Sequence, residues 1–252
     1  MKVDNNIEVF KEFYLRYKSF GKQLITQQTS VYSNIFQTCK EIKEVGLKEE
    51  EVITTSFNIF NILKVEKYED ETHTPFLTDL LDIHGSHRQK DLFYNLFLRE
   101  IIPDGIERLK FTSNNPTYYH ITSQKGVYTQ YGQGFLDIFI DYLEPGRKSF
   151  GIVIENKIYH GDGDNQLNKY VTYLEGLFRD NFLLIYLTPT GKRPEFNSIT
   201  PDRYKELITN GKLKLVSYHN DIQGILNESL NYIKSNKVKY TVLQYISLIN
   251  SL

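Results

Sequence analysis

IVIENKI, residues 152–158, is an apolar, strand-like run that carries two charged side chains. Side chains along a strand alternate between its two faces, so Glu155 and Lys157 point the same way. A buried strand normally excludes both, because burying an unpaired charge costs on the order of several kcal/mol. The pair therefore indicates either a structural salt bridge or a site that needs both charges.

A further carboxylate lies in the apolar run that precedes this one, Leu136-Asp137-Ile138-Phe139-Ile140. Pro145-Gly146 supplies a turn between the two runs, which predicts a hairpin that brings Asp137 close to Glu155. Two neighbouring carboxylates repel each other unless they are protonated or bridged by a cation, and oxygen ligands suit Mg²⁺ or Mn²⁺. With Lys157 to orient or help deprotonate a water, this is the minimum equipment for hydrolysing a phosphodiester.

The wider pattern predicts a fold that mixes helices and strands. Upstream, Thr74-Pro75 begins a helix, and a second helix ends before Pro103. From residue 118 the pattern changes to short runs rich in β-branched and aromatic residues. The expected strands cover 118–128, 135–142, 150–159 and 182–187, and a helix over 166–178 separates the last two. After them we expect a strand over 212–218 and helices over 222–233 and 240–249. The central order is helix, three strands, helix, strand.

The first fifty residues lack proline and carry helically spaced apolar residues, which predicts one or two helices. We expect residues 1–55 to form a helical extension packed on the core. Residues 56–252 should form one globular domain, with Ser56 capping its first short helix.

Composition limits the classes of protein to consider. The chain is 40% hydrophobic and 24% charged, which is typical of folded proteins, and its net charge of −1 gives no global argument for nucleic-acid binding. Cys39 is the only cysteine, which excludes an intramolecular disulfide and a multi-cysteine zinc site. No secretory signal and no apolar run near the ~20 residues of a membrane span are visible, so we expect a cytoplasmic protein without a membrane partner.

These motifs resemble a known family. Asp137 followed by Glu155-Asn156-Lys157 resembles the D…(D/E)xK signature of the PD-(D/E)XK nuclease superfamily, and the order of elements agrees with its αβββαβ core. Gln166 and Tyr170, one helical turn apart, resemble the Q-x-x-x-Y element of its RecB-like branch. The segment 71–77 looks like the helix-one block of its small stand-alone bacterial members. The resemblance implies a restriction-endonuclease-like fold of the α/β (α+β) class, with a central mixed sheet flanked by N- and C-terminal helices.

The resemblance also implies which residues hold the metal ion. Asp137 and Glu155 would bind Mg²⁺ or Mn²⁺ together with an acidic residue of the first core helix. That residue is Glu71, with Asp70 as the competing assignment. The backbone carbonyl of Asn156 would complete the set of ligands, while its side chain points to the opposite face and is structural.

Four further side chains belong to the predicted site. Lys157 would position the attacking water, and Gln166 would steady that lysine or a phosphate oxygen, with Tyr170 beside it. His73 is an accessory residue that would touch a phosphate or a ligand carboxylate. The more ordinary role for His73 is a hydrogen-bonded histidine near a helix start.

The predicted function is a Mg²⁺-dependent nuclease that acts on nucleic acid, DNA favoured over RNA. A role in bacterial defence or mobile elements and a homodimer are expectations at the level of the family. The alternative of a different class is a catalytically silent nucleic-acid-binding or assembly module that keeps the fold. A third reading is a structural protein in which the three charges form a buried network.

Overall fold

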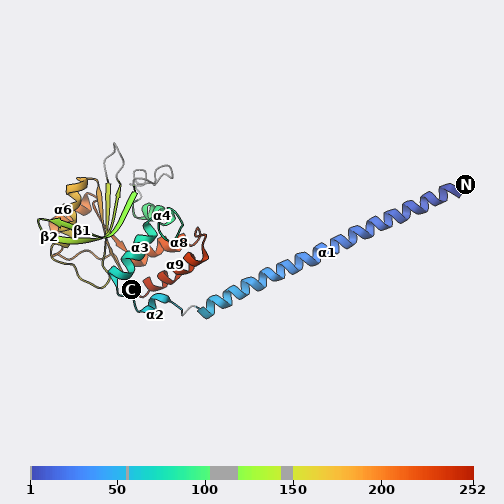
Figure 1. Cartoon of the computed structure of the whole chain (residues 1–252), viewed down its shortest axis with the longest axis horizontal. Helices are drawn as coiled ribbons and strands as arrows, with labels where there is room; N and C mark the ends of the chain where they lie inside the picture. Colours follow the sequence, from blue (N-terminus) through green and yellow to red (C-terminus); the bar gives the residue numbers. More distant parts are fainter. Residues whose placement is uncertain (1, 55–56, 103–118, 143–149) are drawn as a thin grey trace. The chain divides into compact units, whose positions relative to one another are not determined.

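Figure 1 shows the computed structural model of the chain, which describes residues 2–54, 57–102, 119–142 and 150–252. A single five-stranded sheet organises the described residues beyond Asn58, in the order β1-β2-β3-β4-β5. Its strands are β1 (Tyr119–Thr129), β2 (Gly132–Tyr142), β3 (Phe150–Asn156), β4 (Phe182–Thr188) and β5 (Leu213–Ser217). The first three strands pair antiparallel, and β3, β4 and β5 pair parallel. The predicted central mixed sheet is confirmed.

Helices cover both faces of this sheet, as its apolar sequence requires. Every residue of β4 is buried, so neither face of that strand is left to solvent. One face packs against α3 (Thr74–Leu81), α4 (Leu92–Ile101), α8 (Gln223–Ser229) and α9 (Asn236–Ile249). The other packs against α6 (Gln166–Phe178) and α7 (Pro201–Thr209). Figure 1 shows α6 on the side of the sheet away from α3 and α4.

Three short helical elements complete this unit. Helix α2 (Ile59–Leu63) contacts α9, and the wide π-type turn η1 (Glu69–His73) leads directly into α3. A second such turn, η4 (Tyr218–Ile222), joins β5 to α8. The turn η1 therefore delivers its acidic residues immediately before the first core helix.

The N-terminal segment is one helix, α1 (Lys2–Thr54). The chain divides into two units, Met1–Phe57 and Asn58–Leu252, close to the predicted domain boundary. Packing of the extension on the core stays a prediction. Among the described residues, no helix combines the length and the apolar character that a bilayer crossing needs.

The structure corrects the sequence-based elements at several places. Strand β2 begins at Gly132 rather than at 135, α8 ends at Ser229 rather than at 233, and α9 begins at Asn236 rather than at 240. Strand β3 ends at Asn156 rather than at Tyr159, because the amides of residues 158–160 donate to a carboxylate instead of a neighbouring strand. Helix α7 occupies a segment to which the sequence analysis assigns no element. The predicted turn at Pro145-Gly146 lies outside the described residues. The predicted cap at Ser56 is wrong, because α2 begins at Ile59 and its cap is Asn58, whose side chain accepts a 3.0 Å hydrogen bond from the Phe60 amide.

Candidate active site

The β2–β3 hairpin brings two buried carboxylates together. Ile138 pairs with Ile154, and continuing that antiparallel register places Asp137 opposite Glu155. The Oδ2 atom of Asp137 accepts a 2.7 Å hydrogen bond from the backbone amide of Asn156, which fixes this carboxylate against β3. Asp137 is 7% exposed and Glu155 is fully buried. Two acidic groups thus share a site with little water to screen them.

The two carboxylate oxygens of Glu155 differ in their hydrogen-bond partners. Its Oε1 atom accepts a 2.6 Å hydrogen bond from Nε2 of Gln166 and lies 3.1 Å from Nζ of Lys157. Its Oε2 atom is buried and has no hydrogen-bond partner among the described residues. A buried polar atom without a partner costs about 1–3 kcal/mol, more when the group is charged. One carboxylate oxygen is therefore held by donors and the other is left for a ligand.

The pKa values of the three charged residues follow from burial and mutual proximity. Burial raises the pKa of Glu155 well above its ordinary value, and the charge of Asp137 raises it further. Burial also raises the pKa of Asp137, to about 6, against the lowering effects of the Asn156 amide and Lys157. Burial would lower the pKa of Lys157, but the neighbouring Glu155 raises it overall, so this lysine is charged at neutral pH.

The turn η1, immediately before α3, supplies Asp70 to this group through a bridging glutamine. The Nε2 atom of Gln124 lies 3.0 Å from Oδ1 of Asp70 and 3.1 Å from Oδ1 of Asp137. Gln124 adopts a left-handed backbone conformation (φ 50°), which is uncommon for a residue with a side chain. Asp70 is also close enough to raise the pKa of Asp137. Glu71, the favoured sequence-based ligand, is exposed and makes no hydrogen bond or ion pair within the described chain.

Glu69 is a site residue that the sequence analysis does not single out. Its Oε1 atom accepts three consecutive backbone amides, from Ile158 (2.7 Å), Tyr159 (2.5 Å) and His160 (3.0 Å). Burial alone would raise the pKa of Glu69, but these amides lower it below its ordinary value. The carboxylate thereby fixes the backbone that directly follows Lys157. The acidic run 69–71 is the only sequence signal for it.

Gln166 and Tyr170 lie one turn apart on α6, as the resemblance implies. Besides Glu155, Nε2 of Gln166 contacts the hydroxyl of Tyr170 at 3.0 Å, and that hydroxyl donates to the carbonyl of Phe135 at 2.7 Å. The Oε1 atom of Gln166 accepts from the amide of Gly163 at 2.9 Å. The structure thus places Gln166 on Glu155 rather than on Lys157, with both ends of its amide engaged.

Asn156 and His73 lie beside the site with their side chains engaged in the packing. Asn156 donates through Nδ2 to Thr74 (3.2 Å) and accepts through Oδ1 from Tyr218 (2.9 Å), which agrees with its predicted structural side chain. His73 is fully buried, with Nδ1 2.9 Å from the hydroxyl of Tyr245 and Nε2 2.9 Å from the Glu66 carbonyl. Because both ring nitrogens are occupied, the ordinary structural role fits His73 better than the accessory one.

The donor set fits a hard divalent cation held by few protein ligands. In the part of the chain that the structure describes, no three His, Cys, Asp or Glu side chains converge on one metal position. Mg²⁺ is commonly bound by one or two carboxylates and completes its shell with waters and substrate phosphates. The Oε2 of Glu155, which has no donor among the described residues, and the facing Asp137 satisfy that requirement, and burial raises the pKa of both carboxyl groups although Lys157 lies beside them.

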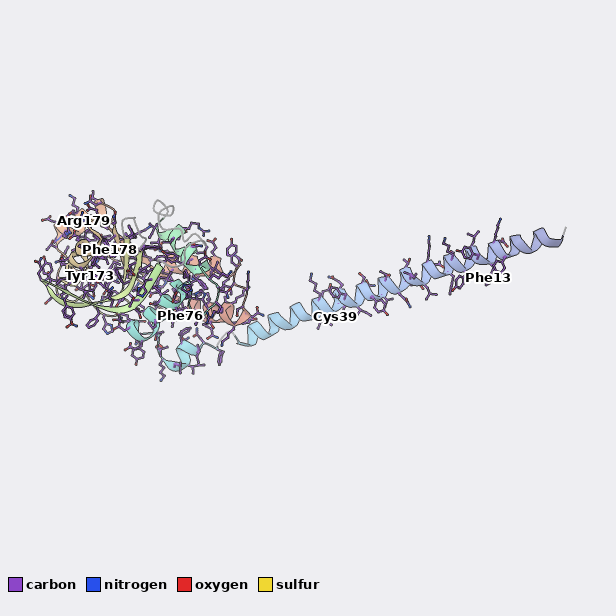
Figure 2. The ribbon with its side chains drawn as sticks, turned by 45° about the horizontal axis from the view of Figure 1, so that its top comes forward. Phe13, Cys39, Phe76, Tyr173, Phe178 and Arg179 are labelled. Atoms are coloured by element: carbon purple, nitrogen blue, oxygen red, sulfur yellow. The ribbon has the colours of Figure 1, made fainter. Side chains whose placement is uncertain are left out.

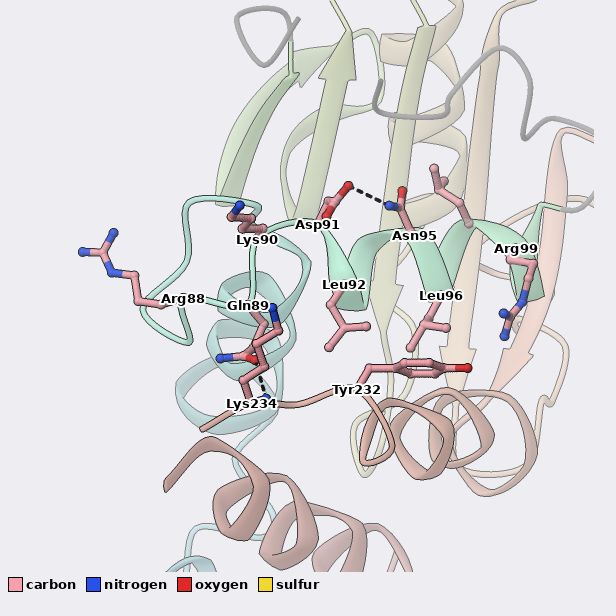
Figure 3. A pocket seen from close by; sticks show the side chains of 11 residues that line it. Arg88, Gln89, Lys90, Asp91, Leu92, Asn95, Leu96, Arg99, Tyr232 and Lys234 are labelled. Carbon is pink, nitrogen blue, oxygen red and sulfur yellow. Dashed lines mark hydrogen bonds between the residues drawn. The ribbon is translucent and has the colours of Figure 1, made fainter. Parts of the chain in front are cut away.

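A cavity of about 790 Å³ lies elsewhere, beside α4, and is lined by apolar, polar and charged side chains (Figure 3). Arg88, Lys90, Arg99 and Lys234 contribute its positive charge. None of the acidic residues described above lines it. The chemistry of the buried carboxylates therefore places the candidate active site around Glu155 rather than in this cavity.

Comparison with known proteins adds one match over most of the chain. The model of the PD-(D/E)XK nuclease superfamily matches residues 57–247. No curated protein matches. Among solved structures, the chain is similar to the MspJI restriction endonuclease in complex with a 27-mer oligonucleotide, at 11% identity and a TM-score of 0.24. That alignment covers 73% of this chain and 36% of the endonuclease chain, so this chain spans about a third of that length. It is also similar to AF1548, a protein of unknown function, at 13% identity, a TM-score of 0.17 and coverages of 64% and 99%.

Proposed function

The chain belongs to the PD-(D/E)XK nuclease superfamily, and from that membership we propose that it is a divalent-metal-dependent nuclease that hydrolyses phosphodiester bonds in DNA. The observation that carries the proposal is the buried Glu155, with one oxygen held by Lys157 and Gln166 and the other without a partner. A buried carboxylate with a purely structural role is expected to have both of its oxygens hydrogen-bonded. A cation site leaves one of them open.

Asp137 and the free oxygen of Glu155 would hold the cation, with the backbone carbonyl of Asn156 beside them. When bound, Mg²⁺ or Mn²⁺ neutralises phosphate charge and makes a water more acidic. The amide of Asn156 holds Asp137 in place and Gln166 holds Glu155, so both carboxylates are oriented before any ligand arrives. We assign the outer acidic position to Asp70 rather than Glu71, because Gln124 links Asp70 to Asp137.

Lys157 would act as a charged donor. Its raised pKa keeps it protonated at neutral pH, which suits orienting a water or stabilising negative charge on phosphate rather than removing a proton. Its head group is 3.1 Å from Glu155, and Glu69 fixes the backbone after it. The Lys157 side chain is thus held by Glu155, and the backbone that follows it is held by Glu69.

DNA as the substrate, a role in bacterial defence and a homodimeric state follow from the family resemblance. A catalytically silent binding module is the competing function. The presence and mutual contact of Asp137, Glu155 and Lys157 support turnover, because a module without turnover has no use for this arrangement.

The test is cleavage of supercoiled plasmid, linear duplex, single-stranded DNA and RNA with Mg²⁺, Mn²⁺ or EDTA. The native chain is compared with Glu155→Gln and Lys157→Ala. Glu100→Gln and Lys205→Ala, at exposed helix positions outside the site, are the matched controls. Metal-dependent cutting that both site variants lose and both controls keep supports the proposal. Binding of DNA without cutting by the native chain favours the silent module, and cutting by the site variants at the native rate refutes the assigned site.

A further inference from the structure

Helix α1 is 53 residues long and exposes many large apolar side chains. Figure 2 shows side chains projecting from it into solvent, with Phe13 and Cys39 labelled. Between residues 10 and 42 the exposed apolar residues are Phe10, Phe13, Tyr14, Leu15, Tyr17, Phe20, Leu24, Ile25, Val31, Tyr32, Ile35, Phe36 and Ile42. Isolated helices gain little stability from propensity alone, so a helix of this composition needs a partner for its apolar face.

The spacing of these residues identifies the kind of partner. Starting at Phe10, steps of four and three residues alternate without a break as far as Ile42. The positions reached are Phe10, Tyr14, Tyr17, Gly21, Leu24, Gln28, Val31, Ile35, Thr38 and Ile42, of which seven are large and apolar. A mean repeat of 3.5 residues keeps one seam facing a second helix along the whole length. We call these ten positions the α1 seam.

The partner must match the length of the seam. The seam spans 33 residues, from 10 to 42, which is roughly 50 Å of helix at 1.5 Å per residue. Among the other described helices, the longest is α9, with 14 residues. Of the described helices only α1 itself is long enough to cover the seam, so the partner that matches its length is α1 of a second copy, which the tests below examine.

The charges around the seam permit two identical faces to meet. Residues 23–39 contain no Lys, Arg, Asp or Glu, so the middle of the helix has no like charges to repel its copy. In the middle of the helix some flanking positions are apolar as well, such as Phe20 and Ile25, while Lys18 and Glu41 flank the seam nearer its ends. Uncharged, apolar flanks widen the surface that self-association can bury.

The polar residue in the seam favours a parallel arrangement. In a parallel, in-register pair, Gln28 meets Gln28 of the second copy, and the two amides can hydrogen-bond to each other. In an antiparallel pair centred on the same seam, Gln28 would face Leu24, which leaves a buried amide without a partner. We propose that α1 is a dimerisation helix that forms a parallel coiled coil with α1 of a second copy through the α1 seam.

The mass of the full chain in solution tests the proposal and does not depend on nuclease activity. Sedimentation velocity at micromolar concentrations compares the native chain with Ile35→Glu in the seam and Ser33→Glu on the opposite side of the helix. We expect a dimer for the native chain and for Ser33→Glu, and half that mass for Ile35→Glu. A monomeric native chain, or an Ile35→Glu chain with native mass, would overturn the proposal; a compact monomer would point to α1 packing on its own chain.

The orientation has its own test, because Cys39 is the only cysteine and is exposed. In a Cys39→Ser background, Val31→Cys places a thiol in the seam, and Ser33→Cys places one outside it. The parallel pair predicts that mild oxidation converts most of the Val31→Cys chain to a disulfide-linked dimer on non-reducing gels, and little of the Ser33→Cys chain. Equal yields from the two variants would refute the parallel seam.

Discussion

The Nζ atom of Lys157 lies 3.1 Å from Oε1 of Glu155, two residues earlier in the chain. The contact uses only one of the two carboxylate oxygens, and Gln166 donates to the same one. This arrangement gives the lysine a fixed position while leaving the other glutamate oxygen without a hydrogen bond. The ion pair therefore holds Lys157 in place and leaves Oε2 of Glu155 without a donor among the described residues.

Removing the lysine head group should abolish most of the activity while leaving the carboxylates in place. We expect Lys157→Ala to lower the single-turnover rate of DNA cleavage by about 100-fold or more, the loss typical of a missing charged or polar donor. The measurement is cleavage with saturating enzyme and Mg²⁺, with Lys205→Ala as the control. A rate within a few fold of native would remove Lys157 from the proposed mechanism.

Neutralising Asp137 should stabilise the metal-free protein at neutral pH. Burial raises the pKa of Asp137 from 3.8 to about 6, so its ionised form is disfavoured in the folded state. A shift of about two units corresponds to ~3 kcal/mol, fully present above pH 6 and absent below about pH 4, where the folded and unfolded chains are both protonated. Asp137→Asn should therefore raise the free energy of unfolding by about 1–3 kcal/mol at pH 7.5, since lost hydrogen bonds offset part of the gain.

The check is denaturant unfolding in EDTA at several pH values. The stability difference between Asp137→Asn and the native chain should shrink as the pH falls from 7.5 to 4. A difference that stays constant over this range would show that the carboxylate is not destabilised by burial.

Glu69 should contribute to stability with the opposite sign to Asp137, because its pKa is lowered rather than raised. Its amide contacts lower its pKa, so its contribution is present above the pKa of the unfolded chain and is lost as the pH falls through the lowered value. We expect Glu69→Gln to lower the free energy of unfolding by about 1–3 kcal/mol at pH 7, because a charged acceptor of three amides becomes neutral. Cleavage should slow as well, because the backbone after Lys157 loses its anchor.

Glu71→Gln is the matched control for Glu69, since it makes the same chemical change two residues away on an exposed side chain. Its unfolding transition should coincide with that of the native chain. Equal destabilisation by the two variants would show that the Glu69 amide contacts do not stabilise the fold.

Metal affinity should separate Asp70 from Glu71. Both residues are exposed, but Asp70 is linked to Asp137 through Gln124 and Glu71 has no such link. We expect Asp70→Asn to weaken Mn²⁺ binding about 10-fold or more, as loss of a supporting group at a metal site does, and Glu71→Gln to leave it unchanged. Isothermal titration calorimetry with Mn²⁺ measures both. The reverse result would restore Glu71 as the ligand of the first core helix.

The sequence alone predicted that Asp137, Glu155 and Lys157 lie together, because the geometry that joins them is local. Strand alternation fixes Glu155 and Lys157 on one side, and a short hairpin fixes which part of β2 lies opposite them. Buried charges in apolar strands are costly, so their positions stand out in the sequence. The Q-x-x-x-Y spacing likewise identified a contact one helical turn long, between Gln166 and Tyr170.

Only the tertiary structure decided which contacts each acidic residue of the 69–71 run makes. These three residues lie in a π-type turn, where the 3.6-residue period that would rank them does not apply. Glu69 accepts hydrogen bonds from backbone amides about ninety residues away in sequence. Asp70 accepts one from Gln124 on β1, a residue with a strained backbone conformation. Contacts at that separation depend on how the helix docks on the sheet, and neither periodicity nor residue spacing encodes that docking.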